Sequence, residues 1–305
     1  PKYRHLFYSS LIFNYSKGQL NPFGYHLINT SLHFFTSIVI FFIAFITIQK
    51  GLSLNKKDAL SIAGITTLLF SINPVHSETV NYISARAVGM SSFFYLSALL
   101  SFILGSLRER RPLTRFFLYI STIICFLAST LSKETALTFP FVLLLYDVCF
   151  MRNNCWAPLK NRILFFYLPL FLCGILAVLN IMSFKNLIVD FWQRIDIGYG
   201  LKQIRIIGYG TRLLLFPIGL TFDYDFPSTF FPSNAILATA ILLTLGIILA
   251  ATLFFPRSLA IVSFCSLWFL LTLAPTNSIF PRLDLLSERN LYLPSFGVLL
   301  LLATT

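Results

Sequence analysis

The chain has 305 residues, of which 57% are hydrophobic and only 11% charged, and its 23 basic and 11 acidic residues give a formal net charge of +12. Soluble domains carry about 25% charged residues, so this composition, with a mean hydropathy of +0.80, excludes a soluble globular fold. A transmembrane β-barrel is excluded as well, because its strands alternate in polarity over about 10 residues and the apolar stretches here do not alternate.

Apolar runs without charge follow one another along the whole chain. They cover residues 18–49, 59–77, 87–107, 116–132, 135–146, 163–184, 226–256, 258–281 and 291–305. A membrane-spanning helix needs about 20 apolar residues, and shorter runs can still cross when flanking Lys and Arg side chains extend to the interface. The sequence therefore predicts an all-α polytopic transmembrane bundle of about nine spans. The first run is too long for a signal peptide and lacks its charged start and cleavage site.

The segment 201–227 is apolar but is not expected to cross the membrane. It carries Arg205 and Arg212, together with two interior glycines and Pro217. A charge in the middle of the bilayer costs at least about 2.5 kcal/mol, and proline and glycine weaken a lone helix further. We therefore predict a re-entrant or interfacial helix on the outer face, within an outer loop at 184–233.

Basic residues concentrate in four short loops, at 49–58, 107–115, 147–162 and 256–257. These loops hold Lys50, Lys56, Lys57, Arg108, Arg110, Arg111, Arg115, Arg152, Lys160, Arg162 and Arg257. Short loops rich in Lys and Arg face the cytoplasm. The positive net charge is thus explained by membrane topology, and no nucleic-acid partner is expected.

The remaining loops should converge on the noncytoplasmic side and form a polar site. They are the segments 1–26, 73–86, 132–135, 184–233 and 277–290, with the acids Glu78, Glu134, Asp190, Asp196, Asp223, Asp225, Asp284 and Glu288. Carboxylates interleaved with Arg and Lys suit an anionic, phosphate-bearing ligand, and a carboxylate can act as a general base. The alternative is that these charges are solvated helix caps, interfacial anchors and local ion pairs.

The cysteines and histidines do not predict a metal site. The five cysteines are scattered without a CxxC or Cys/His spacing, so a disulfide framework or a zinc site is not expected. His26 and His33 are seven residues apart on one helical face, and we expect them to form hydrogen bonds with neighbouring helices and not to bind a metal. No cofactor is indicated, and the sequence leaves open whether a divalent metal assists.

Three motifs in chain order carry a family resemblance: "NPFGYH" at 21–26, "NPVHSE" at 73–78 and "ERNLYLPS" at 288–295. With the sequence around them, the chain resembles the membrane portion of the TMTC-type O-mannosyltransferases, which carry tetratricopeptide repeats behind a multi-pass domain, and of their bacterial relatives. His5 and Asn73 stand where that family often has Pro and His, which bears on fine specificity and not on the fold.

The resemblance implies a GT-C glycosyltransferase fold for residues 1–305, read as one domain of a longer protein. The first spanning helix and the usual catalytic acid would precede Pro1, and a repeat domain would follow. The implied reaction moves a sugar, typically mannose, from a polyprenyl- or dolichyl-phosphate carrier to Ser or Thr of proteins, with inversion. It would occur on the periplasmic or luminal side of a bacterial inner membrane or of the endoplasmic reticulum.

The same resemblance implies the site residues. The expected substrate-binding positions are Arg4, His26, His76, Arg86, Lys133, Asp223, Glu288, Arg289 and Tyr292, and Tyr3, Asn21 and Pro22 match as well. Arg86 and Lys133 are expected to stabilise the departing phosphate, and Glu78 and Glu134 to support catalysis by orienting these cations. On this hypothesis Arg86→Ala and Glu134→Ala lower turnover far more than folding yield.

Three other functions remain open from the sequence. The first is a GT-C transferase that modifies lipid A or an envelope glycan instead of a protein. The second is a transporter of polyprenyl-linked sugars, which would show internal repeats and charged residues near the bilayer midplane; neither is evident. The third is a non-catalytic membrane scaffold.

Overall fold

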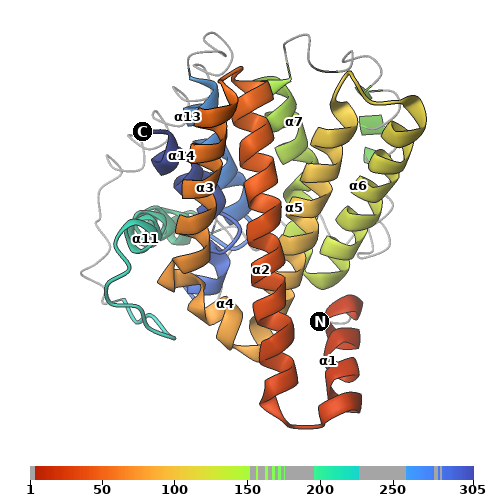
Figure 1. Ribbon diagram of the computed structural model, residues 1–305. Helices are drawn as coiled ribbons and strands as arrows, with labels where there is room; N and C mark the ends of the chain where they lie inside the picture. The colour runs from red at the N-terminus through yellow and green to blue at the C-terminus, as the bar shows by residue number, and fades with distance from the viewer. Residues whose placement is uncertain are drawn as a thin grey trace.

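The structure is a computed structural model that describes residues 4–151, 156, 162–163, 167–168, 171–172, 175, 196–226, 259–277, 281 and 284–305. No residue of these ranges belongs to a β-strand, and an isolated bridge pairs Leu107 with Trp156. The described part is a bundle of helices (Figure 1), which confirms the all-α class. Most of the expected runs at 163–184 and 226–256 lies outside the described residues.

The helices follow the turn signals of the sequence closely. They are α1 (His5–Gly18), α2 (Pro22–Ile46), η1 (Thr47–Gly51), α3 (Lys56–Ile72), η2 (Pro74–His76), α4 (Ser77–Asn81), η3 (Ile83–Ala85), α5 (Arg86–Ser106), α6 (Pro112–Ser132), η4 (Glu134–Thr138), α7 (Phe139–Phe150), α11 (Ile197–Leu215), α13 (Ala260–Leu273), η7 (Glu288–Leu291) and α14 (Ser295–Thr304). Asn21 caps α2 by accepting from the backbone N–H of Phe23, and Asn55 caps α3 in the same way.

The described residues support three or four membrane spans, not nine. Three helices are long and apolar enough to cross, Pro22–Gly51, Ile83–Ser106 and Pro112–Ser132, and Lys56–Ile72 with Pro74–Asn81 forms a pair bent by 51° that would make a fourth. The prediction counted apolar runs, but α7 and α13 extend for only 12 and 14 residues. The length of the apolar runs alone therefore overestimates the number of helices that are long enough to cross the membrane.

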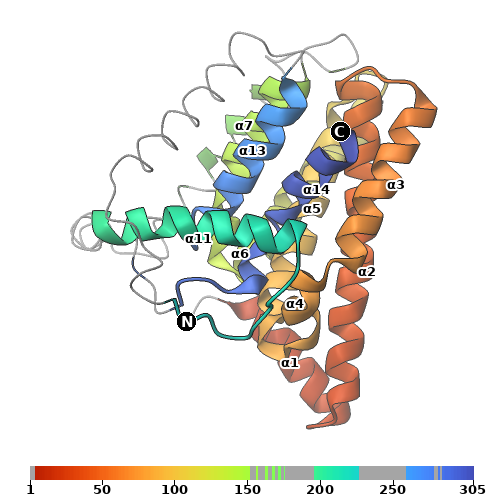
Figure 2. The ribbon, with the colours of Figure 1, turned by 90° about the vertical axis from the view of Figure 1, so that its left-hand side faces the viewer.

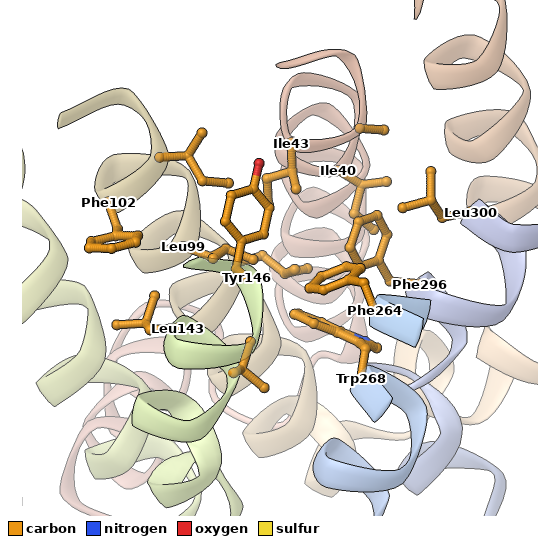
Figure 3. Close-up of a cluster of buried hydrophobic side chains, with 14 of the residues drawn as sticks. Ile40, Ile43, Leu99, Phe102, Leu143, Tyr146, Phe264, Trp268, Phe296 and Leu300 are labelled. Carbon is orange, nitrogen blue, oxygen red and sulfur yellow. The ribbon is translucent and has the colours of Figure 1, made fainter. Parts of the chain in front are cut away.

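The core lies where α7, α13 and α14 meet α2 and α5. Aromatic side chains fill it, as Figure 3 shows for Tyr146, Phe264, Trp268 and Phe296. The hydroxyl of Tyr146 is 2.7 Å from that of Thr47, so this buried polar group has a partner. By contrast, the outward faces of α2 and α6 expose large apolar side chains, as a surface in contact with lipid requires.

Helix α11 runs crosswise to the bundle. Figure 2 shows it lying across α13 and α14, near the end where α1 and α4 lie. Its buried face packs Ile206 and Leu213 with Phe269, Leu273 and Leu291. The crosswise orientation agrees with the prediction for 201–227, while its interfacial position on the outer face stays a prediction. The helix lies inside the outer loop predicted at 184–233, of which 184–195 and 227–233 are not described.

We expect Gly297→Ala to destabilise the bundle, because α13 and α14 approach too closely for a side chain. A Cβ atom at Gly297 would lie 2.7 Å from the carbonyl oxygen of Cys265 and 2.9 Å from Cδ1 of Trp268. Overpacking of this kind costs about 1–3 kcal/mol. The readout is the heating temperature at which detergent-solubilised protein loses its size-exclusion peak. Gly64→Ala is the control, since nothing lies within 4 Å of its added Cβ; equal stability of the two variants would contradict the packing.

Candidate functional site

Segments far apart in the sequence meet at one end of the bundle. In Figure 1, α1 and α4 lie at the bottom, opposite the α2–α3 and α5–α6 connections at the top. The carboxylate of Glu78 on α4 accepts a hydrogen bond from the backbone N–H of Arg289 at 2.8 Å. Residues more than 200 positions apart thus meet at this end, as the convergence of the outer loops predicted.

A basic cavity of about 270 Å³ opens at this end. Arg4, Lys133 and Arg289 line it together with the amide of Asn290. Lys133 is largely buried, and its Nζ donates to Asn290 Oδ1 at 3.1 Å. Three cations around a space of this size can bind an anion, because Arg offers paired donors and Lys a compact charge.

Glu134 holds Arg4 at the edge of this cavity. The guanidinium donates from Nη2 to Oε1 at 2.7 Å and from Nε to Oε2 at 3.0 Å. The hydrogen bond to Glu134 raises the pKa of Arg4. Burial acts to raise the pKa of Glu134, but the bond and charge of Arg4 outweigh it, so the Glu134 pKa is lowered. Both carboxylate oxygens of Glu134 thus orient Arg4, whereas the expectation was that Glu134 orients Arg86 or Lys133.

Glu78 holds Arg289 in a similar way. Besides the backbone N–H of Arg289, it accepts from Ser287 Oγ at 3.2 and 3.3 Å, and Arg289 Nε lies 3.5 Å from Oε1. Arg289 also lies 3.6 Å from Asp284. Glu78 thus orients Arg289, whereas the expectation was that it orients Arg86 or Lys133.

A second, acidic cavity of about 380 Å³ lies beside the first and is lined by Glu78, Glu288, Asn81 and Tyr82, among others. Glu288 is only 4% exposed. Its Oε1 accepts from Tyr224 Oη at 2.6 Å and from the backbone N–H of Thr221 at 3.0 Å. Burial raises the pKa of Glu288 and the charge of Glu78 adds to this, although the two hydrogen bonds oppose it.

The hydrogen bonds that Glu288 accepts from Tyr224 Oη and from the backbone N–H of Thr221 were not predicted from the sequence. The available signal was Tyr224, which stands between Asp223 and Asp225 in "TFDYDF" at 221–226. Burial and the bond to Glu288 raise the pKa of Tyr224, so its hydroxyl stays a proton donor at neutral pH.

Arg86 makes the contacts of a structural residue, because its donors bond to oxygens of neighbouring helices. It is 1% exposed, and its Nε donates to Asn29 Oδ1 at 2.8 Å, its Nη1 to Asn14 Oδ1 and to the carbonyl of Ser10, and its Nη2 to the carbonyl of Tyr25 at 3.1 Å. The guanidinium ties α1 and α2 to α5. These contacts favour a role in folding over the expected contact with a departing phosphate.

His76 and Tyr292 also lie inside the protein. His76 Nδ1 lies 2.8 Å from the carbonyl oxygen of Phe70, and its Nε2 lies 3.0 Å from Ser295 Oγ. Tyr292 Oη is 2.8 Å from His33 Nδ1. Both side chains are buried and engaged between α2, α3 and α14, so they hold helices together and do not line either cavity.

Two other predicted residues lie apart from the cavities. His26 and Asp223 are exposed, and neither lines the basic or the acidic cavity. A buried ion pair that the sequence did not predict, Asp147 with Arg162 at 2.6 Å, lies near the end of α7. Within the described ranges there is no group of three His, Cys, Asp or Glu side chains placed to hold a metal ion.

Comparison with known proteins gives a partial match. No protein-family model matches the chain, and no solved structure matches it significantly. Protein O-mannosyl-transferase TMTC3 of Mus musculus is 35% identical over 100 residues, 33% of this chain and 10% of that protein. Protein O-mannosyl-transferase tmtc2 of Xenopus laevis is 38% identical over 102 residues, 32% of this chain and 11% of that protein.

A fly relative extends the same picture: Protein O-mannosyl-transferase Tmtc3 of Drosophila melanogaster is 32% identical over 111 residues, 33% of this chain and 12% of that protein. The chain therefore matches about a tenth of the length of these curated relatives. The matches support a relationship to the TMTC O-mannosyltransferases over a third of the chain, the family that the motifs resemble.

We expect Arg86→Ala to reduce folding yield strongly. The substitution leaves the side-chain oxygens of Asn14 and Asn29 buried without their donor, and each unsatisfied buried polar group costs about 1–3 kcal/mol. Yield of monodisperse protein in detergent is the measurement. Arg86→Lys should recover only part of it, because an ammonium lacks the planar fork. Normal yield with lost turnover would instead restore the role in phosphate stabilisation.

We expect α1 to loosen at acid pH through the Arg4–Glu134 pair. Because the Glu134 pKa is lowered in the folded protein, the pair stabilises the fold above the ordinary Glu pKa of about 4.3 and is lost as pH falls through the lowered value. Hydrogen exchange of residues 5–12, corrected for the intrinsic rate, should increase over that interval. Glu134→Gln should remove the pH dependence; an unchanged profile in this variant would contradict the assignment.

Proposed function

We propose that this chain is the membrane part of a protein O-mannosyltransferase. It would take mannose from a polyprenyl- or dolichyl-phosphate carrier and transfer it to Ser or Thr hydroxyls with inversion. The reaction would occur at the end of the bundle that holds α1, α4 and η7, on the luminal or periplasmic side. The printed names of the relatives, protein O-mannosyl-transferases, support the reaction class.

The basic cavity is the observation that carries this proposal. It places Arg4, Lys133 and Arg289 around one space at the end of an apolar bundle, where a lipid-borne phosphate would arrive from the membrane. Fixed cations stabilise negative charge that develops on a departing phosphate, because they need no reorganisation during the reaction. Each Arg is held by a carboxylate, Glu134 or Glu78, so the donors are already oriented.

Apolar side chains complete the cavity wall. Phe7, Tyr8 and Val88 line it beside the cations. A wall with both characters suits a ligand that joins a phosphate to an isoprenoid chain. A free anion would need only the polar part.

We expect Lys133→Met to raise the KM for the donor about 10- to 100-fold, because one charge-assisted hydrogen bond is worth about 1.5–3 kcal/mol. The measurement is transfer of labelled mannose from dolichyl-phosphate mannose to a Ser/Thr peptide by the intact protein in proteoliposomes. Lys17→Met is the matched control, since Lys17 is exposed on α1 and does not line the cavity.

Two results would overturn the proposal. One is equal use of a water-soluble nucleotide sugar, which would remove the need for a lipid-borne donor. The other is transfer to a lipid or glycan acceptor with none to the peptide, which would identify an envelope-modifying transferase.

A further inference from the structure

Glu288 is a buried carboxylate without a cationic partner in the described part of the chain. It is 4% exposed, and its Oε1 accepts from Tyr224 Oη at 2.6 Å and from the backbone N–H of Thr221 at 3.0 Å. No Lys, Arg or His of the described ranges forms an ion pair with it, and its Oε2 accepts no hydrogen bond from them. Buried glutamates are almost always paired, so this one indicates a cation that comes from outside the chain.

The other two carboxylates at this end do not share this property. Glu134 forms an ion pair with Arg4, and Glu78 forms one with Arg289. Glu78 also accepts from Ser287 through both of its oxygens. An added cation would therefore find its open acceptor on Glu288, while Glu78 contributes negative potential beside it.

Glu288 lines a cavity that reaches the surface. The acidic cavity, of about 380 Å³, has Glu78 and Glu288 in its wall together with Tyr82 and Phe222. Both aromatic side chains are exposed, and their ring centroids lie 5.2 Å apart. A ligand can therefore enter from outside the bundle, past two apolar rings, and arrive at the buried carboxylate.

This combination of charges and rings suits a lysine side chain. Lysine carries a compact ammonium on a flexible four-carbon stem, and such stems lie along apolar surface while the charged head takes a polar site. A guanidinium is bound best by two acceptor oxygens side by side. Glu288 offers one open oxygen, which matches an ammonium better.

Two other cations fit the cavity less well. Within the described ranges there is no group of three His, Cys, Asp or Glu side chains that could hold a metal ion. The amine of phosphatidylethanolamine lies beside its own phosphate, and that phosphate would enter a cavity walled by Glu78 and Glu288. Charge complementarity therefore favours an ammonium on a polypeptide, which brings no adjacent anion.

We propose, resting on the function proposed above, that the acidic cavity binds a lysine side chain of the acceptor polypeptide. The ammonium donates to Oε2 of Glu288, and the stem lies against Tyr82 and Phe222. The cavity thus selects acceptors that carry a lysine at a set distance from the Ser or Thr that receives the sugar. It takes no part in bond making or breaking.

A polypeptide can use both cavities without a passage between them. Each cavity has exposed residues in its own wall, Ser84 and Asp284 for the basic one and Tyr82 and Phe222 for the acidic one. The η7 turn contributes neighbouring residues, Glu288 and Arg289, to the two walls. A chain that lies across the outside of this turn therefore passes both openings.

The electrostatic state of Glu288 agrees with this role. Burial raises its pKa and the charge of Glu78 adds to this, although the two hydrogen bonds to Oε1 oppose it. A bound ammonium would offset both unfavourable effects, because a nearby positive charge favours the carboxylate. Asp223 and Asp225, exposed in the neighbouring segment, make the approach more negative.

The first test measures binding of labelled Ser/Thr peptides to the intact protein in phosphatidylcholine nanodiscs. Peptides that differ at one position carry lysine, norleucine or acetyl-lysine there, and the position is moved stepwise away from the Ser or Thr. At one spacing, the lysine peptide should bind about 10- to 100-fold more tightly than the other two, the factor of one charge-assisted hydrogen bond. Equal binding of the three peptides at every spacing would overturn the proposal.

The second test uses variants of the cavity. Glu288→Gln keeps an oxygen for Tyr224 and Thr221 but removes the charge, so the preference for lysine should disappear while the norleucine peptide binds as before. Asp225→Asn is the matched control, because Asp225 is exposed and does not line the cavity. An equal loss in this control would indicate a general field of negative charge and overturn the role of Glu288.

A third variant leaves Glu288 in place. Asn81 is exposed in the cavity wall, so Asn81→Lys should fold normally and supply an ammonium from the chain itself. The preference for the lysine peptide should fall at least tenfold, because the acceptor is already occupied. A preference that persists in both Glu288→Gln and Asn81→Lys would overturn the proposal.

Two further outcomes separate the levels of inference. If the peptides bind equally and phosphatidylethanolamine stabilises the wild type but not Glu288→Gln, the ammonium belongs to a lipid and the proposal is wrong. Transfer from dolichyl-phosphate mannose is measured on the same peptides. Transfer without any preference for lysine would leave the function standing and overturn the role of the cavity. Lysine-dependent binding without transfer would leave the lysine site standing and overturn the proposed function.

Discussion

The contact of Glu78 with the start of η7 is the constraint on which the polar end of the molecule depends. One carboxylate accepts from the backbone N–H of Arg289 and from Ser287, and also lies beside the Arg289 guanidinium. It thereby fixes the turn in which Glu288 lines the acidic cavity and its neighbour Arg289 lines the basic cavity. Together with the hydrogen bonds of Glu288 to Tyr224 and Thr221 and the contact of Arg289 with Asp284, it holds these two residues toward different cavities.

Further from this end, buried polar contacts join helices that lipid surrounds. Lipid tails are as apolar as Leu, so burial of apolar surface does not by itself hold helices together in a membrane. The bond between His76 and Ser295 connects η2 to α14, and the bond between His33 and Tyr292 connects α2 to the turn between η7 and α14. These bonds fix the start of α14 and the η7 turn that precedes it. Residues that line neither cavity therefore help to determine the geometry of the η7 turn.

Composition predicted the class of fold and the convergence of polar loops, because both follow from where charge can and cannot lie in a bilayer. The crosswise path of α11 followed in the same way from Arg205 and Arg212. The number of spans did not follow, since Pro74 bends one run by 51° and others form short helices. Composition measures apolarity, whereas crossing also requires an unbroken helix.

The site was harder to predict because a motif names a residue type but not its acceptors. A guanidinium has five N–H donors. Around Arg86 the chain supplies amide and carbonyl oxygens from Asn14, Asn29, Ser10 and Tyr25, and Arg86 lines neither of the two cavities. Around Arg289 it supplies carboxylates on one side and an open cavity on the other. Two arginines of equal standing in the sequence therefore differ in function according to how many of their donors the fold has already used.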